Sequence, residues 1–114
     1  MDKIYLISVH SKRNVKVDLE TNKLLMDLKE KTGLKREKIL TEFLKNTIKK
    51  TNKNKQYIVK LDRSFKVGKV KANIIKIKLD LYNEIKKISE LTCIPVSRII
   101  KASVIYNYEN VEII

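Results

Sequence analysis

The chain contains an internal repeat, in which residues 15–44 recur as residues 75–104 at a constant offset of sixty and without a gap. Each copy begins with alternating apolar and polar residues and continues with apolar residues three and four positions apart. Alternation is typical of a half-buried strand, and the longer spacing is typical of an amphipathic helix. Self-similarity of this kind indicates two copies of one structural unit. The matched apolar positions are Leu25 and Ile85, Leu28 and Ile88, Leu34 and Ile94, Ile39 and Ile99, Leu40 and Ile100, and Leu44 and Val104.

Each copy is predicted to form a strand, a helix, a turn and a second helix, with the strands at residues 15–19 and 75–79. Gly33 lies at the first turn and suits the left-handed residue that commonly ends a helix. Cys93 occupies the equivalent turn, where a left-handed conformation costs on the order of 1 kcal/mol for a residue other than glycine. We expect Cys93 to be a small buried packing residue. Pro95 suits the first turn of the last helix.

The repeats divide the chain into five segments. Each repeat is near the size below which a core alone is rarely sufficient, so the two copies are expected to pack on each other. Polar residues 10–14 are predicted to form a turn, and further hairpin strands are predicted at 3–9 and 56–62. The predicted segments are an N-terminal strand and turn (1–13), the first repeat (14–50), a basic linker (51–73), the second repeat (74–109) and a C-terminal tail (110–114).

Composition argues against several classes of protein. No apolar run approaches the roughly 18 residues of a membrane span, and the N-terminus lacks a secretory pattern, so we expect an intracellular protein. A single cysteine, Cys93, and a single histidine, His10, cannot make an ordinary zinc site. Two glycines exclude a glycine-rich phosphate loop. We therefore expect no cofactor, no metal and no enzymatic activity.

The charge is strongly basic and unevenly distributed. Twenty-six Lys and Arg face thirteen Asp and Glu, a net charge of +13, and residues 45–78 contain twelve basic residues and one acid. Such an excess indicates a polyanionic partner, with nucleic acid favoured over a membrane surface. A biased composition that merely enriches Lys and Ile is the alternative, but it does not explain the clustering.

The pattern of strand, helix, glycine-centred turn and helix in a basic chain resembles the ribbon-helix-helix family of DNA-binding regulators, the Arc and MetJ class. The resemblance covers residues 14–50 and 74–109, and the tandem arrangement is similar to that of regulators encoded by archaeal viruses. It implies an α+β, mostly helical fold with two tandem ribbon-helix-helix motifs. One strand from each motif would pair antiparallel into a ribbon that enters the major groove of double-stranded DNA.

The resemblance also implies which residues contact DNA. Successive strand residues point to opposite faces, so an apolar inner face leaves a polar outer one. The inner face would be Val15, Val17, Leu19, Ile75, Ile77 and Leu79. The base-contacting outer face would be Asn14, Lys16, Asp18, Ile74, Lys76 and Lys78. Phosphates would lie at the starts of the second helices, beside Arg36, Lys38, Ser97 and Arg98. The alternative is that these are ordinary solvated surface residues.

Two departures from the family pattern bear on the site. The segment between strand and first helix is about two residues shorter than usual, and a one-residue register error would exchange the two faces. Asp18 and Glu37 in the first copy correspond to Lys78 and Ser97 in the second, so we expect unequal half-sites, with the second copy better suited to DNA.

The sequence is compatible with three functions. The first is a sequence-specific transcriptional regulator, and the second is an architectural protein that coats DNA with little sequence preference. The third is an antitoxin-like module that grips a protein partner through residues 106–114. The repeats can pair within one chain or between chains, because the linker is long enough for either arrangement.

Overall fold

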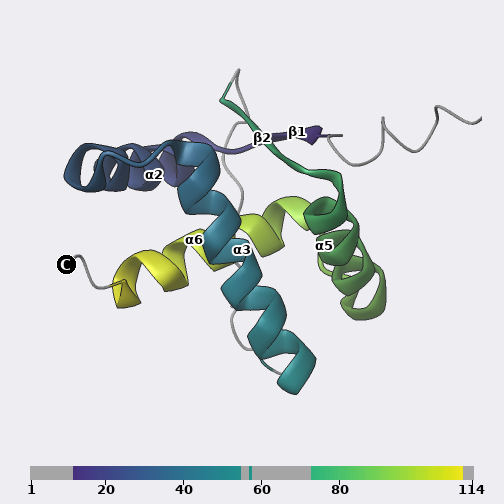
Figure 1. Cartoon of the computed structure of the whole chain (residues 1–114). Coiled ribbons are helices and arrows are strands. Elements are labelled where there is room, and N and C mark those ends of the chain that lie inside the picture. The colour runs from purple at the N-terminus through teal and green to yellow at the C-terminus, as the bar shows by residue number, and fades with distance from the viewer. Residues whose placement is uncertain (1–11, 55–56, 58–72, 112–114) are drawn as a thin grey trace, which may run out of the picture.

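The computed structural model describes residues 12–54, 57 and 73–111. Within them a strand and two helices occur in the same order twice. A two-stranded ribbon lies along one side of the four helices (Figure 1). The elements are β1 (Lys12–Lys16), α2 (Leu19–Thr32), α3 (Arg36–Lys53), β2 (Ile74–Lys78), α5 (Leu79–Thr92) and α6 (Val96–Asn110).

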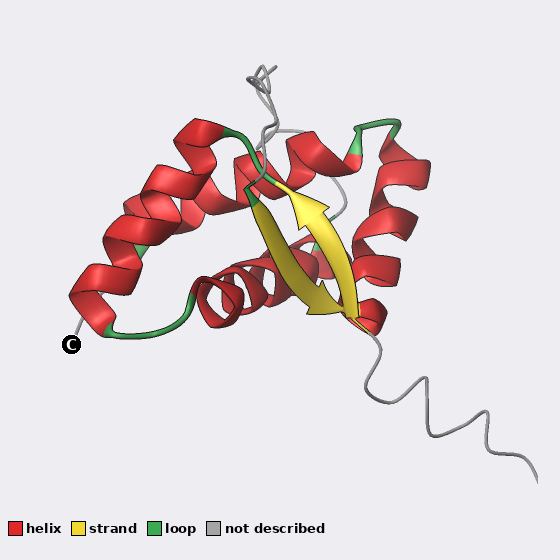
Figure 2. Cartoon of the chain, turned by 90° about the horizontal axis from the view of Figure 1, so that it is seen from above, coloured by secondary structure: helices red, strands yellow, loops and turns green. Residues whose placement is uncertain are grey.

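The strands β1 and β2 pair antiparallel within the one chain, with Val15 opposite Ile75 at the centre of the ribbon (Figure 2). The backbone N–H of Val17 donates to the carbonyl of Asn73 at 3.0 Å, which extends the pairing beyond β1. Because an offset of sixty exchanges Val15 with Ile75, this central pair lies on an approximate two-fold axis between the repeats.

Only some of the residues predicted for the inner face of the ribbon are buried against the helices. Val15, Val17, Ile75 and Ile77 are buried against the helices, as predicted. Leu19 was expected to join them and does not, because it is the first residue of α2 and is 56% exposed. Both strands end earlier than predicted, because α2 begins at Leu19 and α5 at Leu79, the last residues of the predicted strands.

The predicted fold class, an α+β fold of two tandem ribbon-helix-helix motifs with additional strands, is wrong. Four helices of 14, 18, 14 and 15 residues dominate the described part of the chain, which contains one sheet of two five-residue strands. The architecture is therefore mostly helical, with a single ribbon instead of a sheet layer. The strand predicted at 3–9 lies outside the described residues, and of the strand predicted at 56–62 only Tyr57 is described, where it is helical.

The residues at the helix ends adopt conformations that stop or start a helix. Gly33 has φ 75°, which confirms the predicted left-handed end of α2. Cys93 adopts the same left-handed conformation with φ 60°, but it is exposed, so its predicted burial is wrong. Pro95 precedes α6 as its N-cap residue and is not within the first turn. The first helices coincide at the offset of sixty, and α3 extends to Lys53, into the predicted linker.

One hydrophobic core joins the two repeats. Its completely or almost completely buried side chains come from the ribbon and all four helices (Leu25, Leu40, Leu44, Ile75, Ile77, Ile85, Ile99 and Val104). A small polar cluster lies between α3 and α6, where the hydroxyls of Thr47 and Ser103 are 2.6 Å apart. The Asn107 amide donates to the Ser103 carbonyl at 2.7 Å, so the buried polar groups here have partners.

Candidate nucleic-acid interface

The outer face of the ribbon presents its side chains away from the helices. Because Val15, Ile75 and Ile77 are buried against the helices, the residues that alternate with them project outward. All six of them are exposed. They form three directly opposed pairs, Lys12 with Lys78, Asn14 with Lys76, and Lys16 with Ile74.

The approximate two-fold axis divides this face into unlike halves. The offset of sixty relates the pair Asn14–Lys76 to the pair Ile74–Lys16. One half therefore offers an amide and an ammonium group, and the other offers an ammonium group and an apolar side chain. A symmetric dimer of identical chains could not present such a difference.

Two lysines face each other at one end of the ribbon. Lys12 and Lys78 are directly opposite, an arrangement of like charges that destabilises an isolated sheet. The Nζ of Lys12 lies 3.6 Å from a carboxylate oxygen of Glu37, but both side chains are about half exposed and such a pair contributes little. An anion bound at this end would relieve the repulsion.

A basic cleft separates this end of the ribbon from the start of α3. The cleft has a volume of about 460 Å³, and its one acidic lining residue is Glu37. Lys35 is the N-cap residue of α3, and no side chain caps that end, so the helix presents backbone N–H groups and its positive dipole end to the cleft. We call this the lysine cleft, after the six lysines that line it, Lys12, Lys35, Lys38, Lys45, Lys76 and Lys78.

A smaller cleft lies in the equivalent position beside α6. Its volume is about 190 Å³, and Lys16 and Ser97 are among the residues that line it. The Arg13 guanidinium also lines this cleft, with its central carbon 4.2 Å from the centre of the Tyr82 ring. No side chain caps α6 either, since Pro95 is its N-cap residue. The uncapped starts of α3 and α6 therefore flank the ribbon.

The residues predicted to contact phosphate are not equally available. The Arg36 guanidinium donates to the Asn22 side chain at 2.5 Å, which ties it to α2. Lys38 pairs with Glu42 at 2.9 Å along the exposed side of α3. Ser97 is exposed and Arg98 is half-buried near the start of α6.

Sequence reasoning missed three basic residues of this interface. Lys12 and Arg13 fell in a segment predicted to be a turn, although both belong to β1. Lys35 precedes α3 as its N-cap residue. The alternation that identified the strands extends back only to Asn14, so only the cross-strand pairing reveals the first two.

Asp18 does not lie on the outer face, and its predicted contact with bases is wrong. It is 3% exposed, and its side chain accepts from the backbone N–H of Thr21 at 2.9 Å as the N-cap of α2. Its other oxygen accepts from the Lys101 ammonium at 2.9 Å. An acid that caps a helix and faces a buried ammonium cannot also reach a base edge, which explains the error.

Lys101 is a buried cation on α6 that joins two carboxylates of α2. It lies 2.9 Å from Asp18 and 3.0 Å from Glu20. Burial acts to lower the pKa of Lys101, but hydrogen bonds to the two carboxylates outweigh it and leave the pKa above its ordinary value. The charge of Asp18 is thus balanced by an ammonium group inside the protein.

These contacts change the charge distribution on which the predicted inequality of the two repeats was based. The first copy was expected to be the poorer DNA partner because of Asp18 and Glu37. One of these acids is buried against Lys101, and the other faces Lys12. The flank beside α3 carries the lysine cleft and is the more basic of the two.

The C-terminal end of α6 packs on the rest of the molecule. The Tyr108 hydroxyl donates to Asp27 at 2.6 Å, and the Lys50 ammonium lies 4.9 Å from the centre of the Tyr106 ring. Val111 is exposed, and residues 112–114, which complete the segment predicted to bind a protein, lie outside the described part of the chain.

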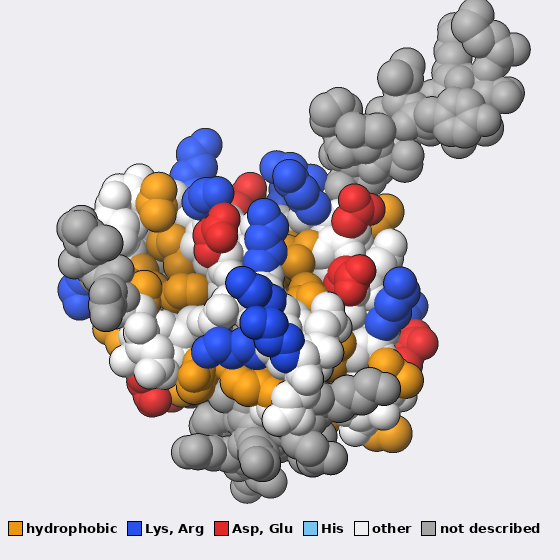
Figure 3. All heavy atoms as spheres, turned by 60° about the horizontal axis from the view of Figure 1, so that its bottom comes forward, with side chains coloured by type: hydrophobic (Ala, Val, Ile, Leu, Met, Phe, Trp, Pro, Cys, Tyr) orange, Lys and Arg blue, Asp and Glu red, His pale blue; other side chains and the backbone are white. Residues whose placement is uncertain are grey.

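Basic side chains also gather away from the ribbon. Figure 3, which turns the underside of Figure 1 forward, shows Lys and Arg grouped in the middle of that face. Three exposed lysines, Lys45, Lys49 and Lys53, lie on α3. None of the described helices is both long and apolar enough to cross a membrane.

Comparisons with known proteins return nothing for this chain. No protein family, no curated protein and no solved structure matches it.

Proposed function

We propose that the protein is a sequence-specific transcriptional regulator that inserts the β1–β2 ribbon into the major groove of double-stranded DNA. The observation that carries the proposal is the outer face of the ribbon, with its four lysines, one asparagine and one isoleucine in opposed pairs. A two-stranded ribbon fits the major groove, where every base pair presents a distinct pattern of donors and acceptors. The resemblance to ribbon-helix-helix regulators supports the same function, which requires an intracellular location.

The two halves of the ribbon suit different bases. The Asn14 amide can donate and accept, as adenine requires, and Lys76 opposite it can donate to guanine. In the other half, Lys16 suits guanine, and the apolar side chain of Ile74 suits the methyl group of thymine. The proposed operator therefore has two dissimilar half-sites.

The flanking clefts suit the phosphate backbone. Helix N-termini and lysine ammonium groups bind phosphate without regard to sequence and fix the protein on the duplex. The lysine cleft beside α3 carries more positive charge than the cleft beside α6. We expect more released counterions, and so a larger contribution to the salt dependence, from the α3 flank.

In vitro selection from random duplex DNA tests the proposal. A regulator should enrich a motif and bind it at least about 10³-fold more tightly than random DNA. Asn14→Ala and Lys76→Ala should relax selection in one half-site, because a good contact to a base edge is worth about 1–3 kcal/mol. Lys35→Ala should weaken all sequences about equally and reduce the salt slope by about one unit.

Lys87→Ala is the matched control, because Lys87 is exposed on α5 and lines neither cleft. It should leave both the motif and the salt slope almost unchanged. If Asn14→Ala and Lys76→Ala select the same motif as the original protein, the ribbon does not read bases and the proposal fails.

An architectural DNA-coating protein is the second candidate. The basic group on the underside favours it, because positive charge on two faces can attract DNA without reading bases (Figure 3). Tight, salt-sensitive binding with no enriched sequence would support this candidate over the regulator.

A further inference from the structure

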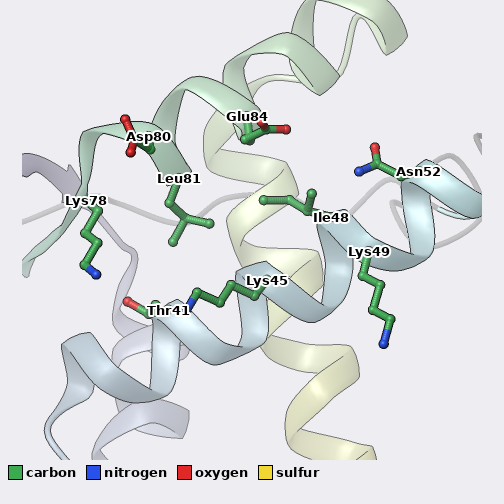
Figure 4. Close-up of a pocket in the computed structure, with 9 residues that line it drawn as sticks. All are labelled: Thr41, Lys45, Ile48, Lys49, Asn52, Lys78, Asp80, Leu81 and Glu84. Carbon is green, nitrogen blue, oxygen red and sulfur yellow. The ribbon is translucent and has the colours of Figure 1, made fainter. Parts of the chain in front are cut away.

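A cavity opens between α3 and the first turns of α5. Its volume is about 450 Å³, which falls in the range of small-molecule sites. Figure 4 shows the side chains of Ile48 and Leu81 pointing into it from the two helices. These two side chains give the cavity an apolar floor.

Different side chains occupy the equivalent position in the other half of the molecule. There Lys101 of α6 reaches Asp18 at the start of α2, and the half-buried Leu24 and Tyr108 pack against the core. The offset of sixty replaces Lys101 by Thr41 and Asp18 by Lys78. A buried ion pair therefore closes one side of the molecule, and a short hydroxyl side chain leaves the other side open.

The cavity has a basic end and an end with an amide and a carboxylate. Lys78 and Lys45 approach Thr41 at one end, and Asn52 and Glu84 lie at the other, while the Asp80 carboxylate points away (Figure 4). Two ammonium groups beside a hydroxyl suit a carboxylate, which accepts charge-assisted hydrogen bonds from both. The apolar floor between the two ends suits a hydrocarbon body.

We infer that this cavity binds a small organic acid with one carboxylate and an apolar body of medium length. The carboxylate lies between Lys45 and Lys78, and the hydrocarbon lies on Ile48 and Leu81. Lys78 also belongs to the outer face of the ribbon and lines the lysine cleft. The bound acid would then compete with DNA for Lys78 and act as an effector. This part of the inference rests on the proposed function.

Binding of octanoate to the free protein tests the site without DNA. Chemical shifts of backbone amides in α3 and the start of α5 should change and saturate together, whereas uncharged octanamide and cationic octylamine should bind at least about tenfold more weakly. Lys45→Met should weaken octanoate about tenfold and leave octanamide unchanged. Ile48→Trp, which fills the cavity, should abolish both.

Lys53→Met is the matched control, because Lys53 is exposed on the same helix but does not line the cavity. It should leave octanoate binding unchanged. Unsaturable shifts spread over the surface, tighter binding of octylamine, or an equal effect of Lys45→Met and Lys53→Met would each overturn the inference.

The link to DNA has its own measurement. Saturating octanoate should weaken operator binding severalfold in the original protein and have no effect in Ile48→Trp, which does not bind it. If octanoate binds as described but no DNA is bound, the cavity stands and the proposed function fails. If DNA binds but octanoate does not, the function stands and the cavity inference fails.

Discussion

The ion pair between Lys101 and Asp18 is expected to contribute to the stability of the fold. The two charged atoms lie 2.9 Å apart, and the side chains are only 9% and 2% exposed. Lys101→Met keeps most of the aliphatic stem but removes the ammonium that faces a buried carboxylate. We expect the free energy of unfolding to fall by about 3 kcal/mol, as is typical when one member of a buried ion pair is removed.

A double-mutant cycle separates the pair from its surroundings. Asp18→Asn keeps an oxygen that can accept from the N–H of Thr21, so it removes the charge and keeps the helix cap. The double variant with Lys101→Met should lose at least about 1 kcal/mol less than the sum of the single losses, because the first substitution has already broken the pair.

Urea unfolding followed by circular dichroism at 222 nm measures all three variants. Lys38→Met is the control, because Lys38 forms an ion pair of the same 2.9 Å length with Glu42 in which both side chains are about half exposed. It should cost no more than about 0.5 kcal/mol. If Lys101→Met costs as little as Lys38→Met, burial does not strengthen this pair and the reasoning is refuted.

The same pair predicts a response to alkaline pH. The pKa of Lys101 is raised above its ordinary value of 10.5, so the folded protein holds this proton more tightly than the unfolded chain does. The stabilisation is complete below the unfolded pKa and is lost as the pH rises through the folded pKa. Lys101→Met should therefore show a shallower loss of stability above about pH 10.5.

Four further substitutions each change a single residue. Cys93→Gly should raise the free energy of unfolding by about 1 kcal/mol, because it removes a left-handed Cβ. Gly33→Ala should lower it by about the same amount, since its added Cβ would meet no atom within 4 Å and only the backbone is strained; equal urea midpoints would contradict both. Asn107→Ala should cost about 1–3 kcal/mol by leaving buried acceptors unsatisfied; an unchanged urea midpoint would count against this role. Burial, together with the interaction with Tyr106, raises the pKa of Tyr57 to about 12. Tyr57→Phe should therefore remove the phase at the highest pH when the tyrosines are titrated and followed by ultraviolet absorbance. If that phase persists in the variant, it belongs to another tyrosine.

Local features of the structure could be predicted from the sequence. The three-and-four spacing located the helices, because it reflects burial of one face of each helix. Gly33 marked the end of α2 because glycine adopts a left-handed conformation without steric cost. The inward direction of Val15 and Ile75 followed from simple alternation.

Features that depend on distant residues could not be predicted. Asp18 alternates correctly for the outer face, but it caps α2 and meets Lys101, which lies 83 residues away. The fold class was wrong because four helices dominate the described residues, which contain a single two-stranded sheet. Lys12 joins the interface only through its pairing with Lys78, and no periodicity within one strand reveals a partner in another.

The difference between the filled and open sides leads to a final prediction. Lys78→Asp with Thr41→Lys would place an ion pair like that of Asp18 and Lys101 at the start of α5. The new aspartate should cap α5, which has no side-chain cap, and raise the free energy of unfolding by about 1 kcal/mol. The longer side chain at position 41 should fill the cavity and abolish octanoate binding.

Comparison of this double variant with Lys78→Asp alone isolates the ion pair from the cap. If the two sides of the molecule are equivalent, the double variant should be the more stable, because the lysine at position 41 provides an ammonium group that pairs with the new aspartate. A less stable double variant would mean that this lysine does not reach position 78 as Lys101 reaches Asp18. The cavity would then result from different helix packing on the two sides, and not from the loss of one ion pair.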